Sequence, residues 1–182
     1  MSLPINIEEL ISGNIVESDR IEYKAGWNPE KILRSICAFA NDFNNIGGGY
    51  IIVGIEEVDG LAKLPPKGIQ ENQIDKIQRE LLRICHHISP NYFPVPSAEE
   101  FIGKLIMIIW APAGDVRPYR APKILEKNSE KFYYIRRMTS SVQAKSADIT
   151  RLFELAAKTP YDNRVNQNYS IDNFNLTTIT TF

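Results

Sequence analysis

The stretch Gly47-Gly48-Gly49-Tyr50-Ile51-Ile52-Val53-Gly54-Ile55 decides the fold of this chain. Its part from Tyr50 to Ile55 is a continuous apolar run, which is typical of a strand buried on both faces of a sheet. The glycines before it lack the Lys-Ser or Lys-Thr of a P-loop and do not precede a helix, as a dinucleotide fingerprint must. We therefore predict that they let the chain turn sharply and pack closely, in preference to holding a nucleotide.

The residues upstream predict a helix and a strand. Asn28-Pro29-Glu30 is typical of a helix start, because Asn is a good cap and Pro suits the first helical position. Apolar residues then repeat at helical spacing as far as Ala40, and the helix should stop near Asn44-Asn45. Earlier, residues 20–24 alternate between charged and apolar side chains, as a half-buried strand does. The charged members Arg20, Glu22 and Lys24 should then share one face.

The residues downstream repeat this alternation of apolar strands and amphipathic helices. We expect strands at 105–110 and 131–138, and helices at 5–11, 74–85 and 148–157. Such a pattern predicts an α/β (α+β) fold, with a mixed sheet and helices packed on its faces. It leaves the strand order open.

Length and composition predict one domain with a tail. Of the 182 residues, 1–160 should form the domain, and the Asn- and Thr-rich segment 161–182 reads as a linker toward an absent C-terminal region. No apolar run approaches the roughly 18 residues of a membrane span, and no signal pattern opens the chain, so we expect the cytoplasm. Cys37 and Cys85 have no CxxC spacing and should be buried thiols.

The charge is unevenly distributed along the chain. The net charge is only −1, but residues 117–145 hold eight basic residues against two glutamates. This stretch is therefore +6 and the remainder −7, which favours one region of the surface that faces phosphates.

Several carboxylates and a lysine could form a metal-dependent site. Glu17, Glu22 and Lys24 surround the first strand, and Glu57 follows the central strand between Glu56 and Asp59. Carboxylates from different strands can bind Mg²⁺ or Mn²⁺ and activate a water, while a Lys stabilises phosphate charge. The alternative is that Arg20, Glu22 and Lys24 are a solvated strand face and that Glu56 to Asp59 form a polar turn.

Aromatic and basic residues alternate between Lys131 and Arg137. Strand geometry puts Phe132, Tyr134 and Arg136 on one side, where they could stack on bases and contact phosphates. The alternative is a row of core aromatics beside arginines that extend to solvent. The residues that we predict to contact nucleic acid are Arg117, Arg120, Lys131, Tyr134, Arg136, Arg137 and Lys145.

Four pieces of sequence, in this order and spacing, make the chain resemble the Schlafen-type AlbA-like family from about Ile7 to Asn163. They are Glu17-Ser18 with Ile21-Glu22-Tyr23-Lys24, Cys37-Ala38-Phe39-Ala40-Asn41, Gly48-Gly49-Tyr50-Ile51-Ile52-Val53-Gly54-Ile55, and Tyr133-Tyr134-Ile135-Arg136. The family is described as DNA-binding. It occurs as the N-terminal domain of prokaryotic transcriptional regulators and RecG-related helicase-like proteins, and in the Schlafen proteins.

The resemblance implies functional residues and a further region. In the Schlafen branch three acidic residues are implicated in RNA cleavage, and the motif match puts them at Glu17, Glu22 and Glu57. The third is usually Asp in the family, and Arg137-Met138 stands where the family commonly has an apolar residue and then Gly. The family also commonly joins this domain to a C-terminal ATPase-like region with a winged helix, which would carry any ATP binding.

Three functions follow from these observations. The first is a DNA- or RNA-binding module of a transcriptional regulator, which holds nucleic acid mainly by its phosphates. The second is a nuclease that depends on Mg²⁺ or Mn²⁺, with Glu17, Glu22 and Glu57 as ligands and Lys24 as the charge stabiliser. The third is a protein-interaction module that forms a homo-oligomer.

Overall fold

The computed structural model describes residues 6–12 and 20–157. The helices of this part are α1 (Ile7–Ser12), α2 (Pro29–Asn41), α3 (Glu71–Cys85) and α4 (Ser146–Ala157). The strands are β1 (Ile21–Lys24), β2 (Gly49–Val53), β3 (Glu57–Val58), β4 (Leu61–Ala62), β5 (Val95–Phe101), β6 (Lys104–Ala111), β7 (Arg120–Pro122), β8 (Lys131–Arg137) and β9 (Ser140–Gln143). The proposed tail at 161–182 lies outside the described residues, so the predicted domain division stays a prediction.

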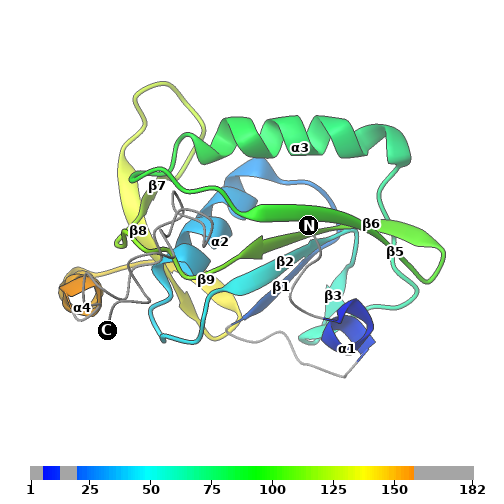
Figure 1. The fold of residues 1–182 in the computed structure, drawn as a ribbon, viewed down its shortest axis with the longest axis horizontal. Helices are drawn as coiled ribbons and strands as arrows, with labels where there is room; N and C mark the ends of the chain where they lie inside the picture. The colour runs from blue at the N-terminus through cyan, green and yellow to red at the C-terminus, as the bar shows by residue number, and fades with distance from the viewer. Residues whose placement is uncertain (1–5, 13–19, 158–182) are drawn as a thin grey trace, which may run out of the picture.

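The main sheet has four strands in the order β1-β2-β6-β5. β1 and β2 are parallel, whereas β2–β6 and β5–β6 are antiparallel. The predicted mixed sheet is therefore confirmed. All five residues of β2 are buried, because α1 packs on one face of the sheet and α2 with α3 on the other (Figure 1).

Helix α2 begins and ends where its side chains satisfy the backbone. The Asn28 side chain accepts a hydrogen bond from the Lys31 N–H at 3.0 Å, and Pro29 takes the first helical position. The helix ends at Asn41, three residues before the predicted stop, because Asp42 adopts a left-handed conformation with φ +42°. The Asp42 carboxylate then accepts the N–H groups of Ile46 and Gly47 at 2.9 and 3.1 Å.

A second sheet, of three antiparallel strands in the order β7-β8-β9, covers the side of α2 away from the main sheet. The core between the two sheets contains α2 residues such as Leu33 and Ile36, together with Met107 of β6 and Tyr134 of β8. On the outer side of β8, Ile135 packs with Leu152 of α4. The chain thus forms layers, with α2 in the middle.

Asn41 connects α2 to the second sheet. It is fully buried, and its side-chain amide donates to the carbonyl oxygens of Tyr119 and Tyr134 at 2.9 and 2.8 Å. Its oxygen accepts the Tyr119 N–H at 2.6 Å. One side chain therefore satisfies three buried backbone groups, which explains the Asn at the end of the Cys37–Asn41 motif.

The glycine run packs against backbone, as predicted. A Cβ on Gly48, whose φ is +80°, would lie 2.6 Å from the Pro112 carbonyl carbon, and one on Gly49 would lie 2.5 Å from the Arg20 oxygen. No larger side chain fits there without displacing the neighbouring strand. The predicted role in close packing is confirmed for Gly48 and Gly49, whereas a Cβ on Gly47 would meet no atom within 4 Å.

Some elements of the fold carry no clear signal in the sequence. Strands β5, β7 and β9 and the β3–β4 hairpin were not predicted. Cys37 and Cys85 are both buried and free, as expected, and burial raises the pKa of each thiol to about 12. Within the described part of the chain, no helix has the length and apolar character needed to cross a bilayer.

Candidate functional site

The alternation of β1 decides where its charged residues lie. Ile21 and Tyr23 point to the α1 side of the sheet, where both are buried. Glu22 and Lys24 therefore point to the α2 side, in register with Ile51 and Val53 of β2. Glu22 is only 6% exposed, so it is not part of a solvated strand face.

Glu22 is held by two cations. Arg136 reaches it from β8, with Nη1 2.7 Å from Oε2, and the Lys24 ammonium lies 2.5 Å from Oε1. The Arg136 guanidinium also donates to the Ile21 carbonyl at 3.3 Å and lies 4.9 Å from the centre of the Phe39 ring. A buried carboxylate needs such partners, because burial without them would cost several kcal/mol.

Two serines complete this polar centre. Ser141 lies opposite Arg136 in the β8–β9 ladder, and its Oγ accepts from Arg136 Nη1 at 3.1 Å. The Ser141 hydroxyl also lies 3.2 Å from the Ser35 Oγ of α2. The centre therefore joins β1, α2, β8 and β9.

An open hollow of about 250 Å³ lies over this polar centre. Lys31 and Arg34, from the first turns of α2, line it together with Lys24, and Arg34 is fixed by a hydrogen bond to the Lys123 carbonyl at 2.5 Å. The full lining is Glu22, Lys24, Lys31, Arg34, Ser35, Thr139, Ser140 and Ser141. Arg136 already neutralises the Glu22 carboxylate, so the side chains of Lys24, Lys31 and Arg34 leave the hollow with an excess of positive charge. We call it the cationic hollow.

The described carboxylates do not fit a metal ion. Both oxygens of Glu22 are engaged by cations. Glu57 is exposed on the β3–β4 hairpin, where it accepts the Gly60 N–H at 2.7 Å, and Glu56 pairs with Lys63. No group of three potential metal ligands occurs among residues 6–12 and 20–157, and Glu17 lies outside them. The described carboxylates therefore supply no set of free oxygens for a metal ion.

The inner face of β8 is part of the core. Tyr134 and Arg136 are 4% and 3% exposed, and Phe132 packs against the same core. Burial raises the pKa of Tyr134. The α2 side of β8 is therefore covered, as in the alternative interpretation of this strand as a row of core aromatics. Neither Tyr134 nor Arg136 can contact a phosphate or base in this conformation. Arg117 is also largely covered, with its Nη1 donating to the Asp42 carbonyl at 3.3 Å.

The other predicted cations lie at the surface. Lys131 and Arg137 lie on the face of β8 that points away from α2. Arg120 of β7 lies opposite Tyr133 in the ladder, and its guanidinium is 5.7 Å from the centre of the Tyr133 ring. Arg137 is engaged by Asp148 of α4 at 2.5 Å. The region formed by Arg120, Lys131, Arg137 and Lys145 is here called the outer basic face.

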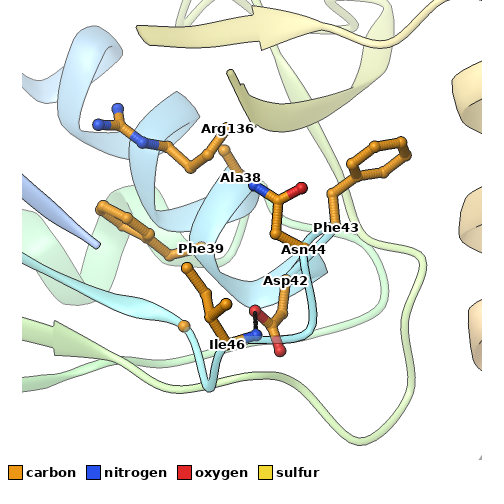
Figure 2. A pocket seen from close by; sticks show the side chains of 8 residues that line it. Ala38, Phe39, Asp42, Phe43, Asn44, Ile46 and Arg136 are labelled. Atoms are coloured by element: carbon orange, nitrogen blue, oxygen red, sulfur yellow. Dashed lines mark hydrogen bonds between the residues drawn. The ribbon is translucent and has the colours of Figure 1, made fainter. Parts of the chain in front are cut away.

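A second, much smaller space adjoins Arg136 on the α2 side. Figure 2 shows Arg136 and Phe39 on one side of it, and Asp42 with its hydrogen bond to the Ile46 N–H on the other. Its volume is about 10 Å³, which is at the lower limit for one water molecule. It is therefore too small to hold a ligand larger than water.

Lys31, Arg34 and the turn at Thr139–Ser141 line the hollow but were not predicted as site residues. The α2 spacing carries a signal, because positions 31, 34 and 35 fall on one face of the helix directly after the charged strand. The turn carries none, because only the pairing of β8 with β9 brings it to the hollow.

Two solved structures are similar to this chain. The DIP2311 protein from Corynebacterium diphtheriae matches with a TM-score of 0.51 and 20% identity, over 76% of this chain and 27% of its own. This chain thus spans about a quarter of that protein. The N-terminal domain of a RecG-related protein from Nitrosomonas europaea matches with a TM-score of 0.46 and 24% identity, over 73% of this chain and 87% of its own. No curated protein matches.

A family model matches the sequence directly. It is described as Schlafen, AlbA_2, and it covers residues 17–145. The match includes β1 with Glu22, the whole of α2 and the β8–β9 hairpin, so it contains every residue that lines the cationic hollow. The resemblance noted in the sequence is confirmed, and the chain belongs to the Schlafen AlbA_2 family.

Proposed function

We propose that this domain binds nucleic acid through its phosphate backbone at the cationic hollow. The observation that carries the proposal is the placement of Lys24, Lys31 and Arg34 around a floor whose buried carboxylate is already neutralised by Arg136. Preorganised cations beside hydroxyl groups are the groups that bind phosphates in proteins. The Ser140 hydroxyl supplies a neutral donor of such a site.

The outer basic face would extend this contact. Arg120 and Lys145 are exposed and Lys131 is half-buried, so all three are accessible to a phosphate. Arg137 would contribute less, since Asp148 already neutralises it. In this proposal the hollow fixes one phosphate, and the outer basic face attracts the rest of the strand.

The wider role is part of the same proposal. The family is related to nucleic acid, and the domain would serve in the cytoplasm as the binding module of a transcriptional regulator. A C-terminal ATPase-like region would then act on the nucleic acid that the module holds. Nuclease activity stays a prediction that only a cleavage assay can test.

A salt series with labelled oligonucleotides tests the proposal. Phosphate contacts release counterions, so the logarithm of the affinity should fall steeply with the logarithm of the salt concentration. Replacing the exposed Lys31 with Ala should lower the slope by about 0.7–0.9, the value of one phosphate contact. Fluorescence anisotropy with duplex DNA, single-stranded DNA and structured RNA measures this.

The matched control is Lys63→Ala. Lys63 is exposed, like Lys31, but it lies directly after the β3–β4 hairpin, pairs with Glu56 and does not line the hollow. It should leave the slope unchanged. Binding that is insensitive to salt, or equal effects of the two substitutions, would contradict the proposal. A stable homo-oligomer without any nucleic-acid binding would favour the protein-interaction function.

A further inference from the structure

A second hollow lies beside the first, on the other side of the segment that connects β1 to α2. Lys24, the last residue of β1, lines the cationic hollow, whereas the next residues, Ala25, Gly26 and Trp27, line the second one. The opposite wall is one face of α3, from Gln73 to Glu80. Its volume is about 360 Å³, within the range of about 300–1,000 Å³ that is typical of small-molecule sites.

The aromatic wall of this hollow is fixed in place. The Trp27 indole N–H donates to Glu80 Oε2 at 2.8 Å, and part of the ring packs against the core between the sheets. The other Glu80 oxygen accepts from Arg83 at 3.2 Å. The ring is half-buried, so its remaining surface lines the hollow without losing further rotational freedom on binding.

The rest of the lining suits a flat ring that is attached to a phosphate. Lys67 and Lys76 are exposed at the hollow, and Gln73 offers an amide to polar ring edges. A Cβ added to Gly26 would meet no atom within 4 Å, so the wall beside Trp27 is open to an incoming group. An aromatic face with cations nearby is the arrangement that binds single-stranded nucleic acid by stacking.

We infer that this second hollow, here called the Trp27 hollow, binds one unpaired base of a single strand of nucleic acid. The phosphate next to that base would lie in the cationic hollow. The inference rests on the proposed function and adds a preference for unpaired bases. A base in a duplex is stacked on both faces and cannot enter, so the domain should prefer single strands to duplexes. The four-residue segment Lys24–Trp27 then lies between base and phosphate.

Tryptophan fluorescence gives a direct test, because the chain has only two tryptophans. Trp110→Phe leaves Trp27 as the single reporter, and Trp27→Phe leaves Trp110. The probes are oligothymidylate and an abasic oligonucleotide of the same length, which has the same phosphates but no bases. Oligothymidylate should quench Trp27 and bind roughly 5- to 140-fold more tightly than the abasic strand, the range expected for stacking one base.

The controls separate this inference from the proposed function. The Trp27→Leu protein should bind both probes with the weak affinity of the abasic strand, and thermal unfolding confirms that it is folded. Lys76→Ala, which leaves the aromatic wall intact, should keep the preference for bases. If both probes bind the unaltered protein equally and Trp27 emission does not change, the inference is overturned while phosphate binding stands. If only Trp110 is quenched, the inference fails. If neither probe binds, the inference and the proposed function both fail.

Discussion

Replacing Arg136 with Met should destabilise the domain by about 3 kcal/mol, although the site is at one end of a strand. The substitution keeps the apolar volume over Phe39 but removes the guanidinium from a 2.7 Å ion pair and from a 3.3 Å hydrogen bond to the Ile21 carbonyl. Breaking a buried pair by removing one partner typically costs about 3–5 kcal/mol, because the other charge is left buried. We expect the lower end, since Lys24 still neutralises Glu22.

A double-mutant cycle isolates the pair itself. Glu22→Gln should also cost about 3 kcal/mol, because it leaves Arg136 buried without a carboxylate. The double variant carries neither charge, so its loss should be smaller than the sum of the two single losses by about 1–3 kcal/mol. Urea denaturation with a common slope gives the free energy of unfolding of each protein.

The control is Lys31→Met, which removes an exposed charge from the same hollow. It should change the free energy of unfolding by less than about 0.5 kcal/mol, as surface substitutions usually do. A loss below about 0.5 kcal/mol for Arg136→Met, or single effects that simply add, would refute the view that this ion pair holds β1 and β8 together. The same stability measurements are a control for the nuclease assay, because a Glu22→Gln protein that is partly unfolded would lose cleavage through unfolding and not through loss of the carboxylate.

Further predictions concern backbone contacts, pH and catalysis. Asn41→Ala should cost at least about 3 kcal/mol in thermal or urea unfolding, because it leaves three buried backbone groups without the Asn41 side chain; a loss near 1 kcal/mol would show that water replaces it. Gly49→Ala should lower the melting temperature, because its Cβ would lie 2.5 Å from the Arg20 carbonyl oxygen; an unchanged melting temperature would contradict this close contact. The backbone N–H of Lys145, followed by Arg137, holds the pKa of Asp148 below its ordinary value of 3.8. The stability that Asp148 contributes is therefore present at neutral pH and lost as the pH falls through its lowered pKa, so the gap between the wild type and Asp148→Asn should close in acid; a gap that widens in acid would reverse the assignment. If the nuclease prediction is right, Glu22→Gln should abolish cleavage in Mn²⁺ while far-UV circular dichroism stays unchanged, and full cleavage by this protein would exclude Glu22 as a ligand.

The elements that could be predicted are those whose sequence signal lies within a few neighbouring residues of the chain. Asn28 and Pro29 specify a helix start by local chemistry, and the run from Tyr50 to Ile55 needs burial on both faces wherever it lies. Strand β5 carries no such run, because it lies at the edge of the sheet with most side chains half-buried. Its sequence therefore resembles that of a loop.

The site was harder to predict because its partners are distant in sequence. The alternation around Glu22 correctly places it on one face with Lys24, but nothing near it specifies Arg136. In β8 the alternation is equally correct, yet which face is buried depends on where α2 packs. Arg136, expected at a phosphate, instead occupies the core for this reason. The alternation of residues along a strand predicts which side chains share a face. Which of the two faces is buried depends on tertiary packing.

The separation of Glu22 and Arg136 by 114 residues has a consequence for the newly made chain. The ribosome makes β1, β2, β5 and β6 before β8, so Glu22 meets its guanidinium partner only after all four strands of the main sheet have been synthesised. Contacts of such long range slow folding, because a large loop must close before they form. A nascent domain would thus pass through a stage with a formed main sheet and an incomplete floor. An anion that occupies the finished hollow at 100 times its Kd would favour the completed state by about 2.7 kcal/mol.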